Sequence, residues 1–166
     1  MAEALLRTRM TEVGTDGPEV RSVGTAAFGG PATPAAVEVL ADRGIDLSGH
    51  VSRPLTDWSL ASADLVVAMT RRHETVIGSA DPNARSRTFL AGEVARLGGQ
   101  VGPRGPRLLA DWVRALDGAR GGHFTTGRVA DEVADPYGEP VETYRACADR
   151  LDGLCTALAR LLATPN

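Results

Sequence analysis

A short segment near the end of the chain combines an acidic side chain with a stiff backbone. It reads DEVADPYGEP over residues 131–140, and Asp135 stands directly before Pro136. A residue that precedes proline is held extended, and Gly138 and Pro140 complete a rigid turn ahead of a long apolar-periodic stretch. An aspartate held in this way suits two roles, a turn or helix-capping residue and a general acid at the mouth of a site. The segment by itself leaves both roles open.

Nucleophilic and metal-binding residue types are few in this sequence. Cys147 and Cys155 stand eight residues apart on one predicted helix. A rise of 1.5 Å per residue puts their Cα atoms about 12 Å apart, too far for a disulfide, and both lie on the apolar face as core residues. The three histidines, His50, His73 and His123, show no metal-ligand spacing, so we expect no metal site and no cofactor. A reducing compartment fits this cysteine usage.

Composition narrows the class of protein. The chain has 166 residues, 43% of them apolar and 23% charged, which is typical of one soluble globular domain. A net charge of −3 argues against a nucleic-acid partner. All 18 basic residues are arginine, so a Schiff-base lysine and a P-loop lysine are excluded. No apolar run reaches membrane-span length and no signal peptide is visible, so we expect no membrane partner and a cytoplasmic location.

Hydrophobic periodicity predicts alternating helices and strands. The run ADLVVAM is continuously apolar, as in a parallel strand covered by helices on both sides. Thr33 and Pro34 are a favourable helix start. The predicted helices cover residues 1–13, 34–44, 70–78, 107–117 and 141–162, and the predicted strands cover 19–25, 63–69 and 87–90, with a loop over 98–106. This order indicates an α/β fold with an open parallel sheet and helices on both faces.

Several motifs, taken in order, resemble one known family. ADPYG followed by an amphipathic helix is similar to the Asp-Pro loop of the low-molecular-weight protein tyrosine phosphatases. MAEALLR is similar to the helix that follows the family's phosphate-binding loop, and SVGT resembles its Ser-Ala-Gly-Thr segment. GIDLSGHVSRPLT resembles its His-x-x-Arg segment, and ADLVVAM its buried third strand. The resemblance covers nearly the whole chain and implies a three-layer α/β fold.

The resemblance also implies roles for particular residues. Asp135 is similar to the family's general acid, which protonates the leaving group and then activates water. Tyr137 and Phe28 resemble the aromatic or apolar walls on either side of the substrate. His50 and Ser22 resemble residues that support the phosphate-binding loop. No metal is implied.

One part of the family pattern has no counterpart in the sequence. In the family, a strand and a Cys-x5-Arg loop precede the helix that MAEALLR resembles, and that cysteine is the nucleophile. Neither cysteine here has an arginine six residues later, because those positions are Gly153 and Leu161. We therefore expect residues 1–166 to form a single phosphatase-like domain that is incomplete at its N-terminus and inactive alone. Since strands lie about 4.8 Å apart, a slot about 10 Å wide is expected between residues 19–25 and 63–69.

Two classes of function follow. The first is a phosphomonoester hydrolase that forms a cysteinyl-phosphate intermediate on the missing loop. The alternative is a non-catalytic domain that binds a partner. An arsenate reductase of the same fold is disfavoured, since residues 70–97 contain no cysteine. Phosphotyrosine in a protein, phosphoarginine and a small phosphate ester all remain open as substrates, as does the oligomeric state.

Overall fold

The structure is a computed structural model that describes residues 1–14, 17–26, 29–55, 60–121 and 128–164. Phe28 and His123 lie outside these ranges. The α-helices of the described residues are α1 (Ala2–Glu12), α2 (Pro34–Ala41), α3 (Arg71–Ala80), α4 (Ala91–Val101), α5 (Leu109–Ala119) and α6 (Val141–Leu162). Short 3-10 helices are η2 (Leu60–Ser62), η3 (Pro82–Arg87) and η4 (Val129–Asp131).

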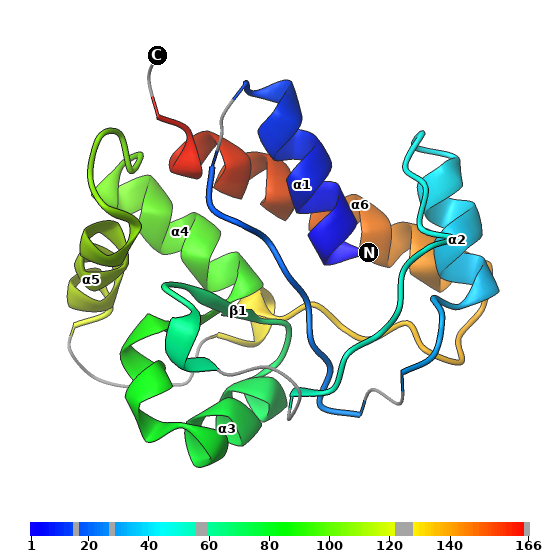
Figure 1. The fold of residues 1–166 in the computed structure, drawn as a ribbon, viewed down its shortest axis with the longest axis horizontal. Coiled ribbons are helices and arrows are strands. Elements are labelled where there is room, and N and C mark those ends of the chain that lie inside the picture. Colours follow the sequence, from blue (N-terminus) through cyan, green and yellow to red (C-terminus); the bar gives the residue numbers. More distant parts are fainter. Residues whose placement is uncertain (15–16, 27–28, 56–59, 122–127, 165–166) are drawn as a thin grey trace.

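Two strands form a parallel pair at the centre of the molecule. β1 (Val66–Ala68) pairs with β2 (Thr88–Leu90), and Val67 lies opposite Phe89. Val67 and Phe89 pack with α1, α4, α5 and α6 on one face, whereas Ala68 and Leu90 pack with α3, η2 and η3 on the other. Alternate side chains of a strand point to opposite faces, so each face of this pair is buried by helices. The α/β architecture with three layers is therefore as the sequence indicates (Figure 1).

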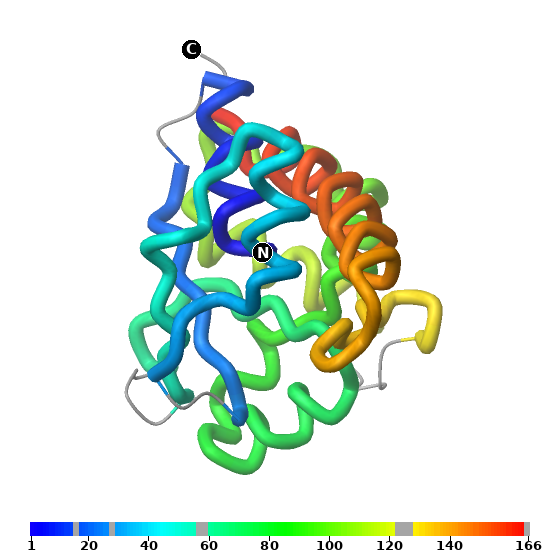
Figure 2. Tube along the Cα trace, turned by 90° about the vertical axis from the view of Figure 1, so that its right-hand side faces the viewer, coloured from blue at the N-terminus to red at the C-terminus, as the bar shows by residue number. Residues whose placement is uncertain are grey.

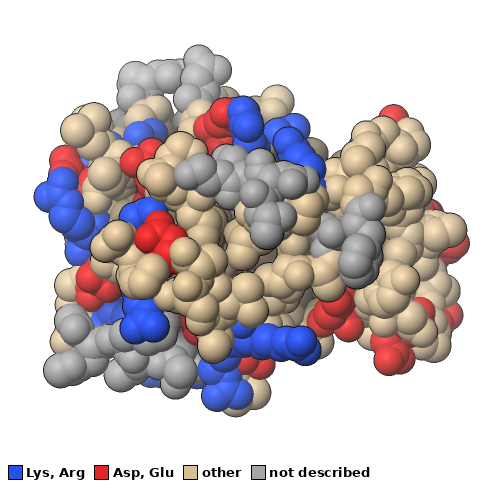
Figure 3. All heavy atoms as spheres, turned by 60° about the horizontal axis from the view of Figure 1, so that its bottom comes forward, with Lys and Arg blue, Asp and Glu red and all other residues tan. Residues whose placement is uncertain are grey.

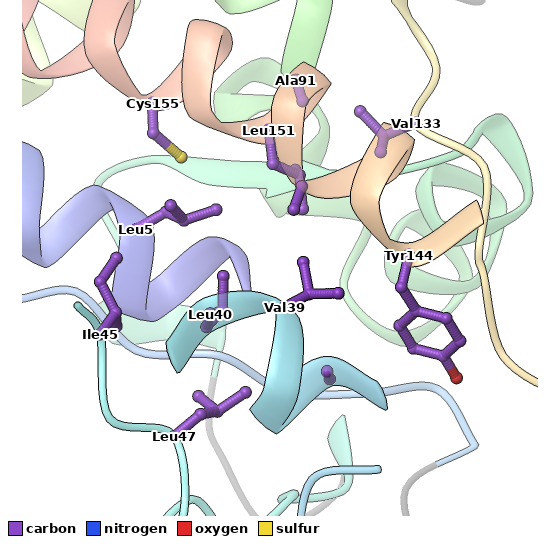
Figure 4. Packing of buried hydrophobic residues seen from close by; sticks show 12 residues of the cluster. Leu5, Val39, Leu40, Ile45, Leu47, Ala91, Val133, Tyr144, Leu151 and Cys155 are labelled. Carbon is purple, nitrogen blue, oxygen red and sulfur yellow. The ribbon is translucent and has the colours of Figure 1, made fainter. Parts of the chain in front are cut away.

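The long helix α6 contributes buried side chains to two hydrophobic clusters. Its part up to Cys155 supplies Tyr144, Leu151 and Cys155 to a cluster with Leu5 of α1 and Leu40 of α2 (Figure 4). Its C-terminal half supplies Leu158, Ala159 and Leu162 to a second cluster with α4 and α5. Cys155 is buried as expected of a core residue, Cys147 is half-buried, and both thiols are free.

Side chains cap two of the helices. The Thr33 hydroxyl accepts a hydrogen bond from the Ala36 N–H at 3.3 Å, with Pro34 at the first position of α2. Thr70 accepts one from the His73 N–H at 3.3 Å and so starts α3 directly after β1. Both caps satisfy a free N–H group of a first turn. The second cap fixes α3 to the carboxyl end of β1.

The structure differs from the prediction in three places. No helix was predicted over residues 91–97, and residues 98–101 were expected in a loop, but together they form helix α4. Gly98 is buried against Leu161, a contact between distant segments that overrides the low helix propensity of glycine. Residues 19–25 are not a strand, because a ladder needs a neighbour and only Gly24 forms a bridge, to Pro54. The predicted strand over 63–69 is shortened to β1.

Residues 17–26 nevertheless run as an extended segment beside the stretch that ends at Leu55 (Figure 2). Gly24 N–H donates to the Arg53 carbonyl at 2.8 Å, and Leu55 N–H donates to the Gly24 carbonyl at 3.1 Å. None of the described helices is both long and apolar enough to span a bilayer.

Candidate active site

A cavity of about 710 Å³ lies between the extended segment 18–25 and β1. Val20 and Ser22 line one side, and Leu65 and Val67 line the other. Leu154 and Leu158 of α6 also line it, so much of its wall is apolar. The cavity occupies the place where the sequence predicts a slot between these two segments. Its volume lies in the range of ligand sites, about 300–1,000 Å³.

Asp135 lies on the wall of this cavity, on a loop tied to the end of β1. Val133 N–H donates to the carbonyl of Met69 at 2.8 Å. Pro136, directly after Asp135, is buried, whereas the aspartate itself is exposed. The Asp135 Oδ1 atom accepts a hydrogen bond from Tyr137 N–H at 3.0 Å, which closes a tight turn. The predicted stiff loop is present, and it presents a carboxyl group to the cavity.

The two carboxylates that shortly precede Asp135 in the chain differ from it in having cationic partners. Asp131 accepts from Arg96 at 2.8 Å, and Glu132 accepts from Arg71 at 2.8 Å. Within the part of the chain that the structure describes, Asp135 has no ion pair. A carboxyl group that is not committed to a cation can take up and release a proton, which is what a general acid and base must do.

His73 is a residue that the sequence analysis did not assign to the site. It lines the same cavity as Asp135, from the first turn of α3. Burial lowers the pKa of His73, and the charge of Asp135 opposes that shift. The imidazole is therefore biased toward its neutral form.

The two cysteines are unsuited to be nucleophiles. The Cys147 thiol donates to the carbonyl of Ala134 at 3.6 Å, and burial raises its pKa. Burial raises the pKa of Cys155 to about 12. Because the thiolate is the reactive form, both groups are inert near neutral pH. Among the described residues, no group of three or more His, Cys, Asp or Glu could hold a metal ion.

Ser22 and His50, the predicted loop-supporting residues, lie near the start of α1. The Ser22 hydroxyl donates to Glu3 Oε2 at 2.5 Å. Glu3 also pairs with Arg7 at 2.9 Å and lies 3.9 Å from Arg53. Burial lowers the pKa of His50, while the charge of Glu3 opposes that shift. Ser22 and Glu3 line the cavity with Asp135, whereas His50 does not.

The structure does not place either of the predicted wall residues at the cavity. The Tyr137 side chain is 76% exposed and does not line the cavity. Phe28 is outside the described residues. Glu3 was not expected at the site, and Arg53 entered the prediction only as the arginine of the His-x-x-Arg segment. The i,i+4 spacing of Glu3 and Arg7 was visible, but the contact with Ser22 spans 19 positions and left no local pattern.

Charges on the surface of the protein are mixed. Acidic and basic side chains are interspersed on the face drawn in Figure 3. Several arginines that cluster in the sequence have acidic partners, among them Arg87 with Asp81 at 3.1 Å. The arginines thus belong to a charge-balanced surface, as the net charge suggested.

The fold and the acidic loop at a cavity define a class of protein. The family model of low molecular weight phosphotyrosine protein phosphatases matches residues 1–95. The chain belongs to this family.

The similar proteins are phosphatases, and their names refer either to protein arginine or to protein tyrosine. The protein-arginine-phosphatase of Bacillus subtilis is 34% identical over 163 residues, covering 98% of this chain and 87% of its own. The probable low molecular weight protein-tyrosine-phosphatase EpsP of Ralstonia nicotianae is 39% identical over 95 residues, which is 57% of this chain and 62% of its own. A crystal structure of a YwlE mutant from Bacillus subtilis has a TM-score of 0.70 and 32% identity, covering 97% of this chain and 87% of that one.

These matches support a phosphatase of the low-molecular-weight type. They do not favour a non-catalytic binding domain. The family implies a phosphoprotein or a small phosphate ester as the substrate.

Proposed function

We propose that the protein removes phosphate from phosphorylated arginine side chains of proteins, with Asp135 as the general acid. The observation that carries the role of Asp135 is its position: an exposed carboxyl on a stiff loop, facing the cavity and without an ion pair among the described residues. The substrate is supported by the relatives that match almost the whole chain. Two of these, covering 98% and 99% of it, are named protein-arginine-phosphatases.

The chemistry of a phosphorylated guanidine requires an acid. A cysteine thiolate on the family's loop forms the S–P bond while the P–N bond breaks, and Asp135 gives its proton to the departing nitrogen. Water then forms the new O–P bond as the S–P bond breaks, and its proton passes to the Asp135 carboxylate. The Asp135 carboxylate, which has no ion pair among the described residues, also stabilises the cationic guanidinium that is released.

The remaining residues are proposed to shape and support this site. Tyr137 and Phe28 act as walls for the substrate, and a guanidinium stacks well on an aromatic face. Ser22 and His50 support the phosphate-binding loop. For Ser22 this role is supported by its hydrogen bond to Glu3 at the cavity. We also expect residues 1–166 to be one domain in a cytoplasmic protein.

The substrate can be tested in a fusion that joins the strand and Cys-x5-Arg loop of a relative to Met1. Phosphate release is measured from matched peptides that carry phosphoarginine or phosphotyrosine. We expect a higher kcat/KM for phosphoarginine. Preference for phosphotyrosine would assign the protein to the tyrosine-specific members instead.

The role of Asp135 is tested in the same fusion. Asp135→Asn should lower kcat by about 10²- to 10⁴-fold, the usual contribution of general acid catalysis. Glu139→Gln is the matched control, because Glu139 is an exposed acid on the same loop. An unchanged kcat in Asp135→Asn would make Asp135 a turn residue.

A further inference from the structure

A second acidic group of residues lies away from the Asp135 carboxyl, in the interior. Glu74 of α3 is 4% exposed and Glu93 of α4 is 2% exposed. The Arg120 Nε atom, at the end of α5, lies 3.3 Å from Glu93 Oε1. Arg120 also donates to the Thr88 carbonyl at 2.6 Å and lies over the Phe89 ring at 3.9 Å. These contacts hold the guanidinium against β2.

The charges of this cluster do not balance when both glutamates are ionised. Glu93 is committed, since Oε1 faces Arg120 and Oε2 accepts from Leu90 N–H at 3.3 Å. Glu74 Oε2 is buried and has no hydrogen-bond partner among the described residues. An ionised carboxylate in such a place costs far more free energy than a neutral carboxyl does. The geometry therefore favours a proton on Glu74.

Other charges around Glu74 act in both directions. Burial is the largest cause that raises the pKa of Glu74, and Glu93 and Glu132 raise it further. Arg120 and Arg71 lower it, and the result is a pKa of about 7. Arg85 of η3 also packs on α3, at Gly78, one turn beyond Glu74.

We propose that Glu74, Glu93 and Arg120 form a proton-dependent latch on helix α3. While Glu74 is protonated, the first turn of α3 stays packed on the interior. When its proton leaves to solvent, two buried carboxylates face one guanidinium, and that turn loosens.

The same turn forms part of the active-site wall. The Glu74 N–H donates to the carbonyl of the capping residue Thr70 at 3.2 Å. His73, its neighbour, lines the cavity that Asp135 faces. Arg71 binds Glu132, three residues before Asp135. Loosening the turn would disturb this wall, so the latch adds pH control to the site without depending on the substrate that the site accepts.

The direction of the effect follows from the pKa. The folded pKa of Glu74 lies above its ordinary value of 4.5, so the stabilising effect of the proton is complete below 4.5. It is lost as the pH rises through about 7. One pH unit above that value, opening of the turn should be about tenfold more favourable than one unit below it.

The test is hydrogen exchange of the amides of residues 71–80 at pH 6 and pH 8, corrected for the intrinsic rates. In the unmodified chain we expect protection of α3 to fall about tenfold, while protection of α6 stays constant. Glu74→Gln should remove this difference. Glu142→Gln, an exposed glutamate on α6, should retain it. A full difference in Glu74→Gln would overturn the latch.

A second measurement needs no variant, should Glu74→Gln fail to fold. Carbon-13 NMR of the glutamate carboxyls in the unmodified chain should show Glu74 titrating near neutral pH, with the α3 amide shifts following the same midpoint. Titration of Glu74 together with the exposed glutamates would refute the proposal. Neither measurement involves a phosphorylated substrate, so the latch and the proposed function fail separately.

Discussion

Arg71 binds Glu132 twice, and both bonds end on the same oxygen. The backbone N–H of Arg71 lies 3.0 Å from Glu132 Oε1, and its Nε atom lies 2.8 Å from it. The pair joins the start of α3 to the segment that leads into Asp135. Together with the hydrogen bond from Val133 N–H to the Met69 carbonyl, it fixes the acidic loop to the carboxyl end of β1.

Removing this pair should loosen the loop. In Arg71→Ala, exchange of the amides over residues 129–138 should become faster by about two- to fivefold, because an exposed pair contributes modestly. Arg72→Ala is the control, because Arg72 is exposed on the same helix and forms no ion pair with any of the described residues. Equal effects of the two variants would show that the Arg71 side chain does not hold the loop.

The Arg71–Glu132 contact should also depend on pH. The hydrogen bonds from the backbone and side chain of Arg71 lower the pKa of Glu132 below its ordinary value of 4.5. The stabilisation is therefore present above 4.5 and is lost as the pH falls through the lowered value. We expect loop protection to decrease on acidification in the unmodified chain and to be insensitive to it in Glu132→Gln.

Two glycines of α4 should respond oppositely to alanine. A Cβ atom at Gly92 would lie 2.6 Å from the Asp131 Cα atom, so Gly92→Ala must displace η4 and should cost about 1–3 kcal/mol. A Cβ atom at Gly99 meets nothing within 4 Å, so Gly99→Ala should stabilise the helix by up to about 1 kcal/mol. Denaturant midpoints of the two variants measure the contrast. A neutral Gly92→Ala would mean that α4 and η4 are less closely packed than described.

The 166-residue chain should not hydrolyse an aryl phosphate. Both thiols have raised pKa values, and neither cysteine is followed by an arginine six residues later. A general acid without a nucleophile has little to assist. Release of nitrophenol by the purified chain is the measurement. Turnover that survives Cys147→Ser with Cys155→Ser but is abolished by Asp135→Ala would reveal chemistry unrelated to the family.

The effect of Asp135→Asn should depend on the leaving group. In the fusion with a relative's loop, nitrophenolate leaves readily without a proton, whereas tyrosine phenolate and guanidine do not. Asp135→Asn should therefore slow hydrolysis of phosphotyrosine and phosphoarginine far more than that of nitrophenyl phosphate. Vanadate binding should hardly change, because it belongs to the loop. Equal slowing of all substrates would contradict a general-acid role.

Much of the fold was predictable because its signals are local. Thr33 with Pro34, the apolar run that contains β1, and the spacing along α6 each predict their element from a few neighbouring residues. Helix α4 was not predicted: residues 91–97 were assigned to no element, and residues 98–106 were expected in a loop. Only the contact with Leu161 explains a glycine at position 98 of a helix. Residues 19–25 have strand composition, but a strand also requires a partner, and the family strand that would lie beside them has no counterpart in the sequence.

The site was predictable to the extent that a single segment determines it. The stiff loop that carries Asp135 is indicated by the proline and glycine around it, whereas the role of Asp135 as a general acid comes from the resemblance to the family and stays a prediction. His73, Glu3 and the pair of Glu74 with Glu93 were not found, because their significance arises from contacts across the fold. A buried glutamate looks in sequence like any exposed one on the same helix.

The packing of α1 on α6 has a consequence for the order of synthesis. Leu5 and Met10 are 0% and 6% exposed, in clusters that α6 completes. Arg9 is bound to Asp152 at 2.7 and 2.9 Å. At about 5–20 residues per second, a ribosome needs roughly 6 to 26 s to pass from Glu12 to Val141. During that interval the apolar face of α1 has no α6 to cover it, so folding is completed only after α6 emerges, and the nascent chain is exposed to chaperones and to aggregation until then.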